Sequence, residues 1–167
     1  NSISSVKTNI LFTNFALKID KLEAFSSEEK ASYKKQVEKE IDEAKYECGM
    51  KGNLEKQSRD MPGIVEHRFN QLQEVEAILE YLNTEMRKTR SKIFRKFLES
   101  YNRALSSRDA EKFVDGEEDV ISLQYLINDF SLVRNRFIGV IKALEAKQFQ
   151  INNIVKLRAA GLEDISL

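Results

Sequence analysis

The sequence predicts an all-α protein made of long helices, packed as an elongated coiled-coil bundle and assembled as a homo-oligomer. Only six of its 167 residues are Gly and one is Pro, so few positions favour turns. Charged residues make up 32% of the chain, which indicates much exposed surface. Apolar residues also recur at alternating steps of three and four, the spacing of a helix face that packs on another helix.

Residues 1–50 form an N-terminal helical extension in this interpretation. Ser26 and Glu29 have the spacing of a capping box, which predicts a helix from this point to about Cys48. Its apolar residues form one narrow line: Tyr33, Val37, Ile41, Ala44 and Cys48. A stripe this thin does not stabilise an isolated helix, so we expect the helix to lie on another element.

A second region, residues 53–167, follows the pair Gly49 and Gly52, where we place the main boundary. Pro62 suits the first turn of a helix, so we expect one helix from about Pro62 to Leu105, about 65 Å long, with Ser106–Asp109 ending it. Its apolar seam contains Val65, Leu72, Val75, Leu79, Leu82, Met86, Ile93 and Phe97.

The C-terminal helix, expected over residues 117–160, has the clearest pattern. The acidic run 115–119 is interpreted as its N-terminal cap rather than a calcium loop, because the ligand spacing of an EF-hand is absent. The oligomerisation seam contains Leu123, Leu126, Phe130, Val133, Phe137, Val140, Leu144, Ile151 and Ile154. Only Lys147 and Arg158 interrupt this coiled-coil register, which predicts burial against another helix of this chain or of a second copy.

A basic stripe lies within residues 86–105 of a chain with 27 cationic and 27 anionic residues. The candidate DNA-binding residues are Arg87, Lys88, Arg90, Lys92, Arg95, Lys96 and Arg103. Most of them share one helix face, opposite the apolar face, so one face can pack while the other meets a polyanion. Phe94, Phe97 and Tyr101 lie nearer the apolar face, where packing is favoured over base stacking. The other interpretation is that the cations serve solubility alone.

No pattern typical of an active site occurs. The single histidine, His67, has Glu66 beside it, and adjacent helical residues point about 100° apart. Phosphate-binding glycine loops, nucleophile elbows and His-Glu-x-x-His are absent. Cys48 is the only cysteine, which excludes an intrachain disulfide and a Cys-built zinc site. No apolar run reaches the ~18 residues that span a bilayer. We expect a protein that is not an enzyme, with no cofactor, metal or membrane.

Four stretches in order, residues 53–64, 86–97, 113–120 and 147–158, resemble landmarks of the UvsY-type recombination mediator proteins of tailed phages. The last is the most specific: a basic residue, then Phe149, Ile151 and Ile154 at fixed steps, closing on Arg158. Together they cover about two thirds of the chain, over residues 53 to 161. In this family a glycine follows the basic segment, whereas here Phe97–Ser100 contains none, so we expect helix to continue there.

The resemblance implies a ring-like homo-oligomer that binds single-stranded DNA. It would help to load a phage recombinase onto DNA already coated by a phage single-strand binding protein. Arg90, Lys92, Arg95 and Lys96 correspond to the phosphate partners. The expected localisation is cytoplasmic, in the host cell if the protein is phage-encoded. A structural or adaptor coiled coil without nucleic-acid binding is the alternative, which explains the heptads and leaves the basic stripe without a purpose.

Overall fold

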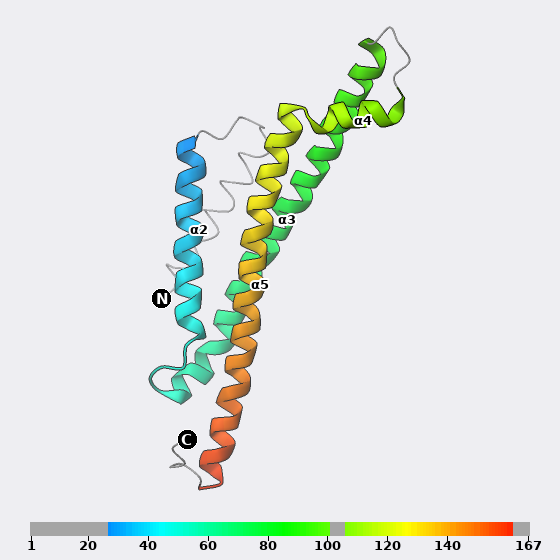
Figure 1. Ribbon diagram of the computed structural model, residues 1–167. Coiled ribbons are helices and arrows are strands. Elements are labelled where there is room, and N and C mark those ends of the chain that lie inside the picture. The colour runs from blue at the N-terminus through cyan, green and yellow to red at the C-terminus, as the bar shows by residue number, and fades with distance from the viewer. Residues whose placement is uncertain (1–26, 101–105, 162–167) are drawn as a thin grey trace. The chain divides into compact units, whose positions relative to one another are not determined.

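The computed structural model describes residues 27–100 and 106–161 (Figure 1). These residues form four helices: α2 (Ser27–Cys48), α3 (Leu54–Ser100), α4 (Ser107–Asp115) and α5 (Glu118–Ala159). The described ranges contain no strand, which confirms the all-α prediction. Residues 1–26 of the expected helical extension, together with Tyr101 and Arg103, lie outside the described residues.

The chain divides into two units. The first consists of residues 1–73 and 135–167, and holds α2 with the beginning of α3 and the end of α5. The second consists of residues 74–134, and holds the rest of α3, α4 and the beginning of α5. In the first unit α2 packs on α3 and α5, and the predicted boundary between residues 50 and 53 stays a prediction.

Helix α2 buries the narrow apolar stripe that the sequence indicates. Val37, Ile41 and Ala44 are buried, and Ala44 belongs to a core cluster with residues of α3 and α5. The buried members of this cluster are Ala44, Met61, Val140, Leu144 and Ile151. The expectation that α2 lies on other helices is therefore confirmed, and burial of these side chains supplies the stabilisation that the helix lacks alone.

Helix α3 begins at Leu54, so the predicted start at Pro62 is wrong. Asn53 caps the helix: its Oδ1 accepts a hydrogen bond from the Lys56 amide at 3.1 Å, and its carbonyl accepts from the Gln57 amide at 3.1 Å. Pro62 then lies inside the helix, where it removes one backbone donor. Just before the cap, Gly52 adopts φ = 82°, a left-handed conformation that glycine favours, where the chain turns from α2 into α3.

Both predicted seams face the interior of the chain. On α3, Leu72, Val75, Leu79, Leu82 and Met86 are buried, and the other seam residues are half-buried. Five residues of the α5 seam are buried: Phe130, Phe137, Val140, Leu144 and Ile151. The remaining four are half-buried: Leu123, Leu126, Val133 and Ile154. The register of three and four therefore identifies the packed faces of both helices.

Helix α4 is a short element in a segment where the sequence pattern predicts no helix. Ser106 does not end a helix but begins one, because its Oγ accepts a hydrogen bond from the Asp109 amide at 3.3 Å and also donates to the Asp109 carboxylate at 2.6 Å. Ala110 and Val114 form its buried side. The next helix, α5, has Glu118 and Asp119 in its first turn, which confirms the acidic N-terminus.

Glu74 lies on α3, and the effect of pH on its buried carboxyl can be tested. Its Oε2 is buried without a hydrogen-bond partner among the described residues, and burial raises the pKa of the carboxyl. The folded protein then holds this proton more tightly than the unfolded chain does. The contribution of Glu74 to stability is therefore greatest below the ordinary pKa of a glutamate carboxyl. This contribution is lost as pH rises through the raised pKa of the folded state. At neutral pH the charged carboxylate is a cost.

Replacement Glu74→Gln should remove that cost. We expect the variant to be more stable than the parent at pH 7, by up to about 0.5 kcal/mol given screening by water, and equally stable at pH 3.5. Thermal unfolding followed by circular dichroism at both pH values measures the difference. An equal gain at both pH values would assign the effect to packing instead of charge.

Candidate nucleic-acid interface

Three cations of the basic stripe form an exposed group on α3, which we call the open track: Lys92, Arg95 and Lys96. On a helix these three positions fall within about 100° of one another. None of them makes an ion pair within the part of the chain that the structure describes. No described carboxylate therefore offsets their charges through an ion pair.

Lys88 extends the open track by one helical turn, but it has a partner. Its Nζ lies 2.6 Å from Oε1 of Glu85, whose side chain is only 10% exposed. The hydrogen bond from Lys88 to the Glu85 carboxylate, and its charge, raise the pKa of the lysine. Lys88 itself remains well exposed, so it can contact an anion while Glu85 partly offsets its charge.

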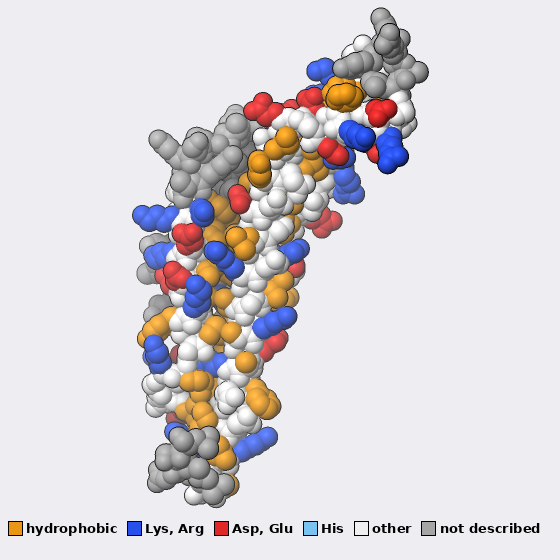
Figure 2. Space-filling view, in the orientation of Figure 1, with side chains coloured by type: hydrophobic (Ala, Val, Ile, Leu, Met, Phe, Trp, Pro, Cys, Tyr) orange, Lys and Arg blue, Asp and Glu red, His pale blue; other side chains and the backbone are white. Residues whose placement is uncertain are grey.

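Arg90 points away from the open track. It stands about 160° around the helix from Lys92, and its Nη1 donates to Oδ1 of Asp115 at the end of α4. The rings of Phe97 and Phe113 lie 5.7 Å apart between the same two helices. Figure 2 shows Lys and Arg side chains beside Asp and Glu around α4. Through these contacts, Arg90 and Phe97 hold α4 on α3.

The remaining predicted DNA-binding residues are dispersed or undescribed. Arg87 is exposed, donates a hydrogen bond to the Thr84 hydroxyl at 3.1 Å, and lies about 100° around the helix from Lys88. Arg103 lies outside the described residues. The structure therefore brings together four of the seven predicted cations, with Lys88 at the edge of the group.

The predicted oligomerisation residues of α5 are at least half-buried within a single chain. Their role between copies stays a prediction. If α5 does not rearrange, a second copy would have to bind a face of the chain other than this seam.

Three comparisons with known proteins found no significant match for this chain among family models, curated proteins or solved structures. The resemblance to recombination mediators therefore stays a prediction. Within the described ranges, no helix combines the length and the apolar character needed to cross a membrane.

Sequence reasoning missed a buried charge cluster in the first unit, centred on Arg68, whose side chain is 2% exposed. Its Nε and Nη2 donate to both carboxylate oxygens of Glu47 at 2.8 Å, and its Nη1 donates to Glu40 at 2.8 Å and to Gln71 at 2.9 Å. The Gln71 amide also donates to Glu40 at 3.0 Å. Burial lowers the pKa of Arg68, but its bonds to Glu47 and Glu40 outweigh burial and raise it.

Lys147, which interrupts the apolar seam of α5, has a structural explanation in the same unit. It is buried, and its Nζ donates a hydrogen bond to the backbone carbonyl of Glu47 at 2.7 Å. That carbonyl belongs to the last turn of α2, where carbonyls lack helical partners and a positive charge is favourable. The three polar side chains that are buried in the described part of this unit, Arg68, Gln71 and Lys147, therefore attach α2 to its neighbours.

Proposed function

We propose that this chain is a non-enzymatic recombination mediator that binds single-stranded DNA. Acting as a homo-oligomer, it would help to load a phage recombinase onto DNA coated by a phage single-strand binding protein, in the cytoplasm of the host cell. The observation that carries the proposal is the open track: Lys92, Arg95 and Lys96 are exposed and share one face of α3 without an ion-pair partner among the described residues.

The open track favours contacts to phosphates over contacts to bases. Lys and Arg neutralise phosphates without reading sequence, so binding would be sequence-independent. From Lys88 to Lys96 the cations span about 12 Å of helix, so one subunit engages only a few phosphates. Several subunits on one strand would raise the overall affinity without any new contact. Zero net charge keeps the rest of the surface from attracting DNA in general.

The salt dependence of binding tests this proposal. If four cations contact a single strand, the logarithm of the binding constant should change with the logarithm of the salt concentration with a slope of about −3. Fluorescence anisotropy of labelled oligo(dT), titrated with protein from 50 to 300 mM salt, measures this slope. Absence of binding at 50 mM salt, or binding that salt does not weaken, would overturn the proposal. Duplex DNA of equal length serves as the comparison ligand.

A structural or adaptor coiled coil without nucleic-acid binding is the second candidate. Two observations favour it: Lys88 and Arg90 are already paired with carboxylates, and Phe97 packs on Phe113. Such a protein would associate with itself or a partner and would leave oligo(dT) unbound at all salt concentrations. The same titration therefore separates the two candidates.

A further inference from the structure

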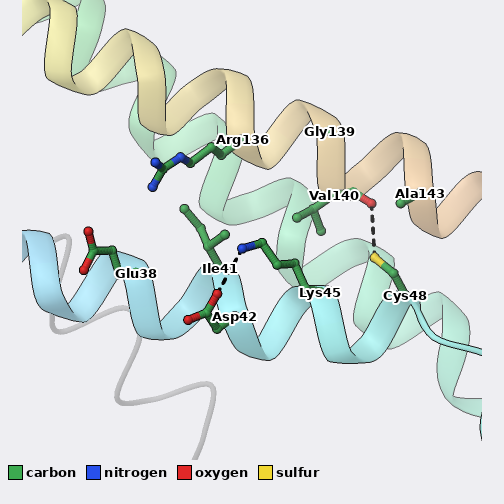
Figure 3. Close-up of a pocket in the computed structure, with 9 residues that line it drawn as sticks. All are labelled: Glu38, Ile41, Asp42, Lys45, Cys48, Arg136, Gly139, Val140 and Ala143. Carbon is green, nitrogen blue, oxygen red and sulfur yellow. Dashed lines mark hydrogen bonds and ion pairs between the residues drawn. The ribbon is translucent and has the colours of Figure 1, made fainter.

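A groove of about 530 Å³ lies between α2 and α5 in the first unit (Figure 3). Ile41 and Val140 form its apolar floor, where the Cys48 thiol donates a hydrogen bond to the Val140 carbonyl at 3.8 Å. Gly139 and Ala143 border it on α5 and are exposed, and a Cβ built on Gly139 would meet nothing within 4 Å. The groove is therefore uncharged at its floor and has space for another helix to approach closely.

The two sides of this groove carry opposite charges. On α2, Glu38 and Asp42 are exposed, and Asp42 is bonded to Lys45 at 3.0 Å, which leaves this side acidic overall. On α5, Arg136 is exposed and makes no ion pair with any described residue. Figure 3 shows Glu38 and Arg136 on the two helices that border the groove, at the same end of it.

We infer that this groove binds the same groove of a second copy of the chain. A two-fold axis parallel to the groove places the acidic side of one copy opposite the basic side of the other. Glu38 then faces the Arg136 position of the second copy, and the reverse contact forms by symmetry. An arrangement with antiparallel grooves would bring like helices together and lose this match.

The packing within one chain supports this choice of occupant. The predicted apolar seam of α5 is used inside the chain, where its nine residues are buried or half-buried. The groove lies on another face, where Gly139 and Ala143 are exposed. A two-fold contact joins two copies, which is one step of the self-association in the proposed function, and to that extent the inference depends on that function.

A charge exchange between two variants tests the inference in the absence of DNA. Arg136→Glu makes both sides of the groove acidic, whereas Glu38→Lys makes them mostly basic. Each variant alone should self-associate at least tenfold more weakly than the parent. An equimolar mixture should form a pair that contains one copy of each, which native mass spectrometry resolves by mass. Since this pairing occurs only between chains, repair of a contact within one chain cannot imitate it.

Two controls accompany this experiment. Lys156→Glu changes charge by the same amount on an exposed position of α5 outside the groove, and should associate like the parent. Cys48, the only thiol, lines the groove and should react more slowly with a thiol reagent as parent protein concentration rises, but not in Arg136→Glu. Circular dichroism confirms that each variant is folded.

The possible outcomes separate the two proposals. A parent that stays monomeric, variants that associate like the parent, or a mixture that forms no mixed pair would overturn the groove interface. The result of the oligo(dT) titration does not depend on these self-association measurements. Binding of oligo(dT) without groove pairing removes this inference alone, and groove pairing without oligo(dT) binding removes the proposed function alone.

Discussion

Replacing Arg68 with methionine should lower the free energy of unfolding by about 3–5 kcal/mol, because it leaves Glu40 and Glu47 without the cation that pairs them in a largely buried site. Methionine fills much of the vacated space, so the loss reports mainly on charge and hydrogen bonding. For a chain of this length the melting temperature should fall by about 6–20 °C. Urea unfolding followed by circular dichroism measures the change in free energy.

Arg59→Met provides the matched control. Arg59 also donates to a glutamate, Glu55, at 2.8 Å, but both side chains are more than 70% exposed. An exposed pair one helical turn apart contributes about 0.3–0.5 kcal/mol, so this variant should unfold almost like the parent. Both substitutions remove an arginine–glutamate contact of 2.8 Å, but Arg68 is buried and donates four hydrogen bonds, whereas Arg59 is exposed and donates one. Equal effects would show that the Arg68 cluster does not hold α2 to α3.

The sequence contained a signal for this cluster. Continuing the α3 seam backwards by steps of three and four from Leu72 reaches Arg68, Val65 and Met61, so Arg68 occupies a seam position. A cation on a packed face requires a buried partner. The partners, Glu40 and Glu47, are seven residues apart on α2 and therefore share a face. Their identity as partners depended on how α2 packs, which periodicity alone does not specify.

Helix types and packed faces could be predicted, whereas helix starts could not. The start of α3 is set by the side chain of Asn53, which competes with the general preference of proline for a first turn. The Ser106 and Asp109 pair is a capping signal of the same kind, and it was interpreted as the end of a helix. Both differences arise because one hydrogen bond, from a backbone amide to the side chain of the capping residue, decides where the helix begins.

The segment that carries the candidate site could be predicted from sequence. Which of its cations are exposed and free of carboxylate partners among the described residues could not be predicted. Arg90 is removed from the open track by Asp115, which lies 25 residues away and reaches it only because α4 folds back onto α3. Lys88 is partly neutralised by Glu85, a nearly buried carboxylate on the preceding turn. The count of cations in the segment therefore overstates the number of phosphates that one subunit can contact.

Charge reversal of the open track, with Lys92, Arg95 and Lys96 all replaced by glutamate, should weaken oligo(dT) binding by about two orders of magnitude at 50 mM salt. Three phosphate contacts are lost, and three new carboxylates repel the strand. Lys88 alone would remain, so the log-log salt slope should become shallower, from about −3 to about −0.7. The three side chains are exposed and form no ion pair with described residues, so helicity and self-association should stay unchanged.

The matched control reverses three other exposed cations, Lys34, Lys35 and Lys39 on α2. This variant has the same net charge as the open-track variant, so any general repulsion between protein and DNA is equal in both. Binding that falls equally in the two variants would show that overall charge, not the open track, controls DNA affinity. Loss of binding only in the open-track variant would locate the contact on α3, because the two variants carry the same net charge.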